Sequence, residues 1–289
     1  MCMFCRTTGH EMHTVRAVVG CTYTLNRRER HDASRGDARG GAVKPYYKHG
    51  GVTIYHGDCL DVLPSLKAEC IITSPPYNCR MDYEGHDDAM SVPAYLSWLE
   101  DRYHAMANAL KPGGYVCLNV ASWIGSRAEQ VFAFDEIKAL ADRQLPFCDL
   151  VLWAKNPPSG TAWGNYPTTP RIRANHEWVL VHRAPGASLG PSNISWEEWA
   201  RLTQSVWNIN PVLPYRDEHP ATFPVELPRR LAMLYSRDGG LIVDPFMGTG
   251  TTLEAARRTG RTAIGIEANE RYCEVAAQRL SQALLEFSA

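Results

Sequence analysis

The sequence predicts an α/β fold built on a mostly parallel sheet. Two short apolar runs, at residues 70–72 and 241–243, have the length of buried strands, and each leads directly into a loop. Amphipathic helical patterns follow at about 92–110 and 270–287. Strands that alternate with helices indicate a doubly wound sheet with helices on both faces. Because such sheets bind ligands beyond the carboxyl ends of their strands, both loops are candidate binding segments.

Apolar spacing supports the elements of the first half in order. Tyr95, Leu99 and Met106 repeat at helical spacing within 92–110, and the Pro-Gly-Gly run at 112–114 is expected to end this helix. The other expected elements of this half are a strand at 52–55, a short helix ending at 66, strands at 70–73 and 115–120, a helix at 129–142 and a strand at 147–153.

The second half opens on a strand at 178–182 and an irregular polar stretch that contains one short helix. It closes on a regular alternation of helices and strands, which is typical of a parallel sheet. The expected elements are helices at 196–202 and 225–235, a strand at 241–244, a helix at 252–258, a strand at 263–267 and a helix at 270–287.

The composition fits one substantial core with an inserted segment. The chain has 289 residues, 45% of them hydrophobic, and residues 1–43 lack a sustained apolar period. We therefore expect a flexible extension at 1–43 and a single domain at 44–289. Nine cysteines without regular spacing, and no signal-like apolar run, predict a cytoplasmic protein with reduced thiols. With a net charge of −1, any nucleic-acid contact must use local basic surface.

Four residues near the start have side chains that bind zinc in other proteins: Cys2, Cys5, His10 and His13. The gap between the two pairs is far shorter than in zinc fingers, and no core follows that a metal would fold. We therefore predict no metal site.

The segment 244–252 has the composition of a ligand-binding glycine loop. Gly248 and Gly250 allow the main chain to approach a ligand closely, and Thr251 opens the next helix with free N–H groups. Glu267 ends the next strand, where a carboxylate can accept both hydroxyls of a ribose. An adenosine-bearing cofactor fits this arrangement. A nicotinamide cofactor and a turn without ligand remain alternatives, whereas the missing lysine excludes a Walker phosphate loop.

The segment Ser74-Pro75-Pro76-Tyr77 predicts a rigid loop with spare hydrogen-bond acceptors. Two consecutive prolines remove two N–H donors and fix φ, so not every carbonyl here can be used locally. An exocyclic amino group donates two hydrogens, and the Ser74 hydroxyl and a loop carbonyl can accept them. This pairing favours a pyramidal nitrogen that can attack a methyl sulfonium, while Tyr77 stacks on the ring.

Together the two loops resemble those of the permuted (beta-group) DNA amino-methyltransferases, which modify cytosine N4 or adenine N6 with S-adenosylmethionine. In that family a catalytic loop precedes a target-recognition region and then the cofactor loop, and the same order holds over about residues 46–286. The resemblance implies a mostly parallel seven-stranded sheet with helices on both faces and a target-recognition insertion at about 155–218.

The resemblance also implies roles for individual residues. The base must leave the duplex and enter the pocket at the catalytic loop, which comprises Ser74, Pro75, Pro76 and Tyr77. The implied cofactor-binding residues are Asp58, Cys59, Thr73, His219, Phe223, Asp244, Pro245, Phe246, Gly248, Gly250, Thr251 and Glu267. The expected DNA-binding residues are Asn78, Lys155, Trp163, Arg171, Arg173 and His176, which offer donors for phosphates and base edges or rings that stack.

Other classes of protein are less consistent with the sequence. Methyltransferases of RNA or of protein amides place the cofactor loop first and favour Asn in the catalytic loop, and cytosine C5 methylation needs a Pro-Cys dipeptide that is absent. An inactive DNA-binding module would not need all of these residues. Within the family Ser74 resembles the cytosine N4 enzymes, with adenine N6 as the alternative. The expected partners are double-stranded DNA and a cognate restriction endonuclease, with the protein a monomer or homodimer.

Overall fold

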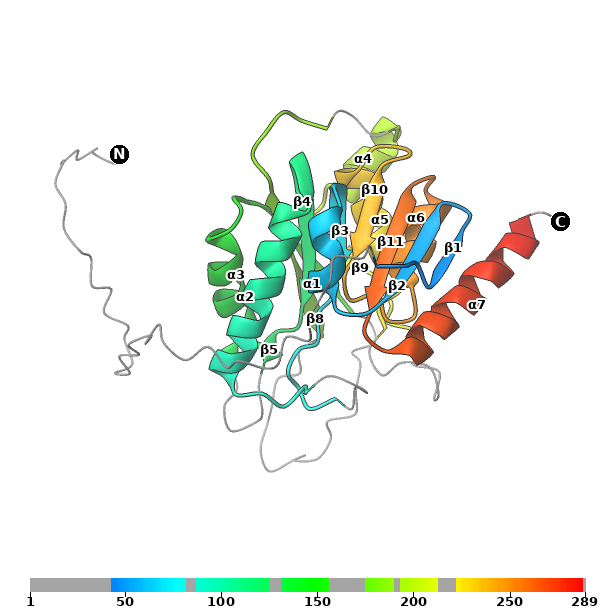
Figure 1. Ribbon diagram of the computed structural model, residues 1–289. Helices are drawn as coiled ribbons and strands as arrows, with labels where there is room; N and C mark the ends of the chain where they lie inside the picture. Colours follow the sequence, from blue (N-terminus) through cyan, green and yellow to red (C-terminus); the bar gives the residue numbers. More distant parts are fainter. Residues whose placement is uncertain are drawn as a thin grey trace, which may run out of the picture. The chain divides into compact units, whose positions relative to one another are not determined.

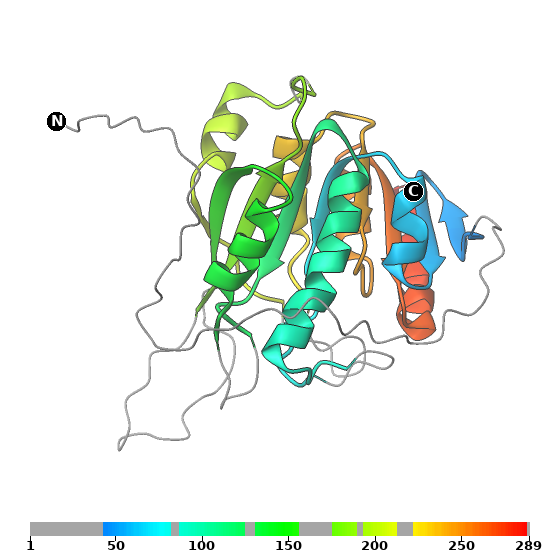
Figure 2. The same ribbon diagram turned by 60° about the vertical axis from the view of Figure 1, so that its left-hand side comes forward.

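The computed structural model describes residues 43–81, 87–124, 131–155, 175–189, 193–212 and 222–287. Within this part of the chain, a nine-stranded sheet carries helices on both faces (Figures 1 and 2). The strand order is β1-β2-β11-β10-β3-β4-β8-β7-β9. The strands from β2 to β4 run parallel to one another, β8 is antiparallel to both β4 and β7, and β9 is parallel to β7. The predicted doubly wound α/β fold is confirmed, and short strands add to both edges of the expected seven.

The strands of the main sheet have the following bounds: β1 Tyr47–His49, β2 Val52–His56, β3 Ala68–Thr73, β4 Leu110–Val120, β7 Phe147–Ala154, β8 His176–Arg183, β9 Val206–Asn208, β10 Leu241–Asp244 and β11 Thr262–Glu267. A separate small pair consists of β5 (Trp123–Ile124) and β6 (Val131–Phe132). The helices are α1 Cys59–Val62, the 3-10 turn η1 Leu63–Ser65, α2 Val92–Asn108, α3 Ala133–Asp142, α4 Trp196–Leu202, α5 Glu226–Tyr235, α6 Thr251–Arg258 and α7 Glu270–Phe287.

The largest difference from the sequence prediction lies where α2 gives way to β4. Residues 111–114 were expected to form a loop that stops the helix, but α2 ends at Asn108 and β4 already begins at Leu110. Ala68 pairs with Leu110 across β3 and β4, and the register shifts before Cys70 pairs with Tyr115. The Pro-Gly-Gly run is therefore an irregularity inside a strand. Proline and glycine end helices, but they also occur at irregular points within strands.

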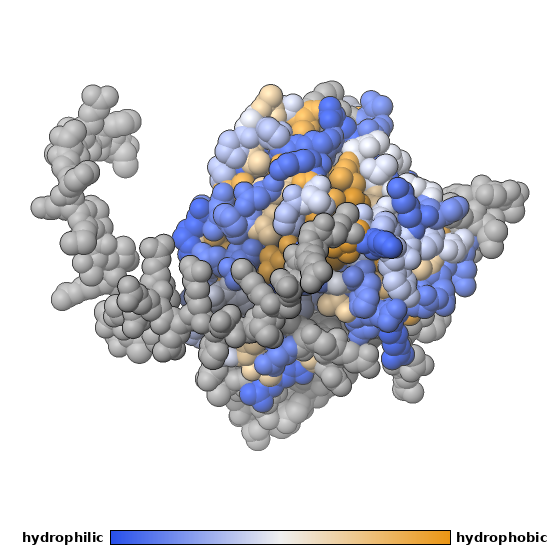
Figure 3. All heavy atoms as spheres, in the orientation of Figure 1, coloured by the Kyte–Doolittle hydropathy of each residue, from blue (hydrophilic) through white to orange (hydrophobic). Residues whose placement is uncertain are grey.

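Two apolar clusters, one on each face of the sheet, form the core. One cluster packs α1, α2 and α3 against the sheet, with Leu99, Tyr103 and Ile137 fully buried. The other packs α5, α6 and α7, with Leu253 and Ala276 fully buried. Figures 1 and 2 show α2 and α3 on the opposite side of the sheet from α5. On the face seen in Figure 3, hydrophilic residues predominate and apolar ones appear in narrow patches between them.

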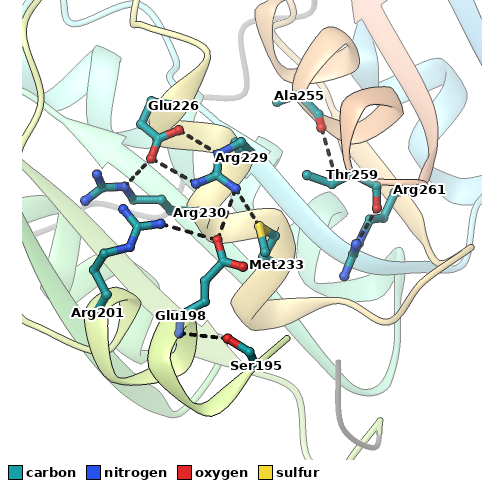
Figure 4. A network of polar contacts seen from close by, with 10 residues as sticks. All are labelled: Ser195, Glu198, Arg201, Glu226, Arg229, Arg230, Met233, Ala255, Thr259 and Arg261. Carbon is teal, nitrogen blue, oxygen red and sulfur yellow. Dashed lines mark hydrogen bonds and ion pairs between the residues drawn. The ribbon is translucent and has the colours of Figure 1, made fainter. Parts of the chain in front are cut away.

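A cluster of ion pairs joins α4 to α5 (Figure 4). Glu226 accepts hydrogen bonds from Arg229 and Arg230, and Glu198 pairs with Arg229 and Arg201. Burial alone would raise the pKa of Glu226, but the two arginines outweigh it and hold that pKa at about 2. In the described residues, no helix is both long and apolar enough to span a membrane.

Gly113 has a conformation and a position that exclude a side chain. Its φ is +78°, and a Cβ added there would lie 2.0 Å from the carbonyl oxygen of Ala187. Gly239 has a φ of +73°, but nothing lies within 4 Å of an added Cβ. Gly113→Ala should therefore destabilise the fold by clearly more than the roughly 1 kcal/mol expected from backbone strain alone in Gly239→Ala. Urea denaturation of both variants measures this; equal losses would show that the carbonyl clash does not matter.

Candidate active site

The two loops singled out in the sequence meet because β3 and β10 are neighbours in the sheet. Thr73 ends β3, and its hydroxyl donates to Oδ1 of Asp244, at the end of β10, over 2.6 Å. The same carboxylate oxygen accepts the N–H of Phe246 at 3.1 Å. Asp244 is fully enclosed, and this burial raises its pKa to about 6. A single buried carboxylate thus fixes the start of the glycine loop against the end of the strand that carries Ser74.

A cavity of about 240 Å³ lies between these two loops. Its walls come from both loops, from the turn before α1, from α2 and from the segments around α5 and α7. The residues that line it are Gly57, Asp58, Cys59, Ser74, Pro75, Pro76, Tyr77, Trp98, Arg102, Thr222, Phe223, Pro245, Phe246, Met247, Gly248, Thr249, Thr251, Glu267, Ala268 and Tyr272. One hollow therefore joins the catalytic segment to the glycine loop.

Glu267 is held rigidly at the cavity wall by main-chain N–H groups. One carboxylate oxygen accepts from Gly248 at 3.0 Å and the other from Asn269 at 2.9 Å. Burial raises the pKa of this carboxyl group, although the N–H groups act against that shift. Because each carboxylate oxygen has a second lone pair, Glu267 can still accept two hydroxyl hydrogens from a ligand.

An aromatic and charged wall faces the glycine loop from α2. The rings of Trp98 and Phe246 have centroids 5.6 Å apart, and the Arg102 guanidinium lies 4.2 Å from the Trp98 centroid. Arg102 also pairs with Oδ2 of Asp58 at 2.8 Å, while Oδ1 of Asp58 caps α1 through the N–H of Leu60. The sequence prediction missed Trp98 and Arg102. The sequence does hold a signal for them, because Trp98 and Arg102 are one helical turn apart on the helix that follows the catalytic loop.

The catalytic segment is built around two hydroxyl groups. The oxygens of Ser74 and Tyr77 lie 2.6 Å apart, and both side chains line the cavity. Buried Tyr95 donates its hydroxyl hydrogen to the carbonyl of Pro76 at 2.8 Å. One carbonyl of the proline loop is therefore used by the protein itself, and the carbonyls of Ser74 and Pro75 are the better acceptors for a ligand.

Asp88 holds the chain immediately after the catalytic segment. Its carboxylate accepts main-chain N–H groups from Asn78 at 2.7 Å, Cys79 at 3.0 Å and Met81 at 2.9 Å. Asn78 and Arg80 both have positive φ, 57° and 63°, which is costly for residues other than glycine. The buried carboxylate offsets this cost with three charge-assisted hydrogen bonds.

The structure moves several predicted residues away from a ligand-facing position. Thr73, Asp244 and Gly250 do not line the cavity but support its walls. Asn78, expected at DNA, is buried and donates its amide to the carbonyl of Met90. Lys155, also expected at DNA, is mostly buried and pairs with Glu177.

His176 is half-buried and meets the ring of Trp178 edge-on. Four predicted site residues lie outside the described part of the chain: Trp163, Arg171, Arg173 and His219. The Cys/His segment near the start also lies outside it, and the described residues contain no cluster able to hold a metal ion. The target-recognition insertion expected at about 155–218 includes two strands of the central sheet, because β8 pairs with β4 and β9 pairs with β7.

A family model described as DNA methylase, of the N6/N4 amino-methyltransferases, matches residues 68–278, which include both loops and the strands between them. The chain belongs to this family. A curated relative, the type II methyltransferase M.ScaI of Streptomyces caespitosus, is 29% identical over 86% of this chain and 88% of its own length. The type II methyltransferase M.HpaI of Haemophilus parainfluenzae is 28% identical over 77% of this chain and 73% of its own.

Solved structures agree with this assignment. A putative DNA modification methylase from Thermus thermophilus, complexed with S-adenosyl-L-methionine, superposes with a TM-score of 0.63 at 26% identity, covering 79% of this chain and 93% of its own. The cytosine-N4-specific PvuII DNA methyltransferase shares the fold, with a TM-score of 0.64 at 22% identity over 82% and 88% of the two chains. The chain is a DNA amino-methyltransferase, and the family's methyl donor is S-adenosylmethionine.

The raised pKa of Asp244 predicts a specific pH dependence of stability. Because its folded-state pKa of about 6 exceeds the ordinary aspartate value, its contribution to stability is complete below about pH 4 and declines as pH rises through 6. Asp244→Asn cannot titrate. The stability of the natural protein relative to this variant should therefore fall between pH 4 and pH 7, by up to about 3 kcal/mol. Chemical denaturation across this range tests it, and a constant difference would refute the raised pKa.

Proposed function

We propose that the protein methylates the N4 amino group of cytosine within a specific double-stranded DNA sequence. The observation that carries this proposal is Ser74, a neutral hydroxyl at the first position of the catalytic loop and on the cavity wall. Within the family, serine at this position resembles the cytosine N4 enzymes, which favours cytosine N4 over adenine N6. The catalytic loop supports an amino-group substrate of either kind, because it presents hydrogen-bond acceptors rather than a thiol nucleophile.

The proposed cofactor end of the cavity is the part between α2 and the glycine loop. Glu267 would accept the ribose hydroxyls, the rings of Trp98 and Phe246 would enclose the adenine, and Asp58 would accept its amino hydrogens. The main chain at Gly248 and the residues Thr222 and Phe223 would lie along the remainder. Bound there, S-adenosylmethionine supplies a methyl group on a positively charged sulfur, which needs no further activation.

The proposed target end is the catalytic segment. Ser74 would accept one amino hydrogen and the carbonyl of Ser74 or Pro75 the other, so that the nitrogen lone pair turns out of the ring plane. Tyr77 would hold the base, which has to be flipped out of the duplex to reach this depth. The rigid proline loop positions these acceptors before the base arrives, which lowers the cost of reaching the transition state.

We further propose that DNA is read mainly by the segments around residues 156–174 and 213–221, with Trp163, Arg171 and Arg173 as the first candidates. They have the residue types suited to phosphates, base edges and stacking. The curated relatives carry type II names, and we propose a cognate restriction endonuclease as a partner in the cell. We also propose that the protein is a monomer or a homodimer.

Nucleoside analysis decides which base is modified. The protein, expressed in a host without its own DNA methylation, should produce N4-methylcytosine in one sequence context, and Ser74→Ala should reduce the amount at least about 100-fold because an amino acceptor is lost. Mass spectrometry of digested DNA, with long-read sequencing for the context, measures both. N6-methyladenine in place of N4-methylcytosine would overturn the cytosine proposal and leave the family unaffected.

The proposed ribose contact predicts a selective loss of cofactor affinity. Glu267→Gln should weaken S-adenosylmethionine binding by about 1.5–3 kcal/mol, the usual value of lost charged hydrogen bonds. Glu254→Gln is the matched control, since Glu254 is also a buried acid but pairs with Arg258 and Arg279 outside the cavity. Calorimetric titration measures both affinities. Equal affinities in the two variants would remove Glu267 from the cofactor site.

A further inference from the structure

The hydroxyl of Tyr77 is the centre of a hydrogen-bonded network that extends away from the cavity. It lies 2.6 Å from Oγ of Ser74, 3.1 Å from Oε2 of Glu177 and 2.8 Å from Nδ2 of Asn119. Nδ2 of Asn119 also donates to Oε2 of Glu177 at 2.6 Å. Oε1 of Glu177 pairs with the ammonium group of Lys155. Ser74 and Tyr77 line the cavity, whereas the other three residues lie behind them.

The chemistry of these groups favours one direction for each hydrogen bond. An ionised carboxylate only accepts and the nitrogen of an amide side chain only donates, so Tyr77 gives its single hydroxyl hydrogen to Glu177 and accepts one from Asn119. Oγ of Ser74 at 2.6 Å and the carbonyl of Asn119 at 3.4 Å can also accept this hydrogen, but both are uncharged, and a charged carboxylate is the stronger acceptor. The remaining lone pair of the Tyr77 oxygen then receives the hydroxyl hydrogen of Ser74.

This arrangement makes Ser74 an acceptor toward the cavity. With its own hydrogen committed to Tyr77, Oγ presents only lone pairs to a ligand, which suits an amino group that has only hydrogens to offer. Without Glu177, the Tyr77 hydroxyl could donate to Ser74 instead, and Ser74 would then point a hydrogen at the incoming amino group. A mostly buried acid behind the loop thus decides which way the Ser74 hydroxyl hydrogen points.

We propose that Glu177 is a positioning residue and the terminal proton acceptor of a relay that runs from Ser74 through Tyr77. The inference rests on the proposed role of Ser74 at the target amino group. As the new N–C bond forms and the S–C bond of the donor breaks, the amino nitrogen becomes cationic and loses one proton to Oγ of Ser74. The original Ser74 hydrogen moves to the Tyr77 oxygen, and the original Tyr77 hydrogen moves to Oε2 of Glu177.

All atoms and charges balance in this step. The donor leaves as a neutral thioether, the methylated amine is neutral, and the positive charge originally on sulfur is carried away as the proton on Glu177. The side chain of Glu177 is 14% exposed, which gives that proton a route to solvent after turnover. Ser74 and Tyr77 each still carry one hydrogen after the step, and the relay is reset once Glu177 ionises and the two hydroxyl hydrogens turn back toward Tyr77 and Glu177.

Lys155 completes the relay in a role different from that expected from the sequence. Its ammonium pairs with Oε1 of Glu177 and lies 4.6 Å from the centroid of Trp153, so both charged groups are held in a largely enclosed place. A pair of this kind keeps the carboxylate in one orientation. Oε2 is thereby directed at Tyr77 and Asn119 rather than at solvent.

Glu177→Gln separates the relay from a purely structural ion pair. Glutamine keeps the size of the side chain and an acceptor for Tyr77 but cannot take up a proton. The single-turnover rate of methyl transfer should fall by about 100-fold, within the usual contribution of general-base groups. Affinities for S-adenosylmethionine and for DNA, and the fluorescence of 2-aminopurine at the target position as a measure of base flipping, should stay within about twofold of the natural protein.

Tyr77→Phe interrupts the same relay at its centre and keeps the ring. Its loss of rate should be of similar size, and the double variant should lose no more than the larger single loss, because both changes break one pathway. Glu100→Gln, in an exposed pair with Arg143, and Tyr115→Phe, outside the cavity, are the matched controls and should keep the full rate.

Two results would overturn the relay: an unchanged rate in Glu177→Gln, or losses in the two single variants that multiply in the double variant. A parallel loss of cofactor affinity and melting temperature in Glu177→Gln would show an ordinary structural ion pair, which also overturns it. The rates are compared on whichever base the protein modifies. A product other than N4-methylcytosine therefore counts against the cytosine proposal and leaves the test of Glu177 unaffected.

Discussion

The hydrogen bond from Thr73 to Asp244 is the constraint on which the site depends. It joins the carboxyl ends of two adjacent parallel strands, and each strand leads directly into one of the two functional loops. Because Asp244 is fully buried and also fixes the N–H of Phe246, the glycine loop has little freedom to move relative to Ser74. The distance between methyl donor and acceptor in an enzyme of this kind is thus set by the sheet rather than by the loops.

The parts of the site that sequence reasoning could predict are local ones. A proline pair and a glycine loop act through their own backbone geometry, so the loops at Ser74 and Gly248 were predictable without a fold. Most predicted strands and helices are present in the structure with small changes at their ends. They could be predicted because apolar residues repeat along each element with the period of a helix or a strand. The strand expected at 115–120 is present, but its start at Leu110 was missed, because the pairing of Leu110 with Ala68 of β3 does not show in the local turn preference of Pro112 and Gly113.

Contacts between segments that are far apart in the chain could not be predicted from the sequence. Trp98 and Arg102 belong to the cavity only because α2 packs beside Phe246 of the glycine loop and beside Asp58 at the start of α1. Glu177 reaches Tyr77 only because β8 runs antiparallel beside β4, and this contact also removes Lys155 from the expected DNA surface. Charge and residue type predicted a phosphate contact for that lysine, but the mostly buried carboxylate of Glu177 on the neighbouring strand is its partner in the structure.

The strand order has a consequence for how the protein is made. β2 and β3 are close in sequence, but β11 and β10 lie between them in the sheet, and those two strands come from residues 241–267. While the ribosome is still translating, the earlier strands therefore have a gap at the centre of the sheet. Because Gly248 and Glu267 line the cofactor cavity, this cavity cannot form before residues 241–267 have been made, so the binding site for the methyl donor is completed late in synthesis. An incomplete product of translation would be unable to modify the genome.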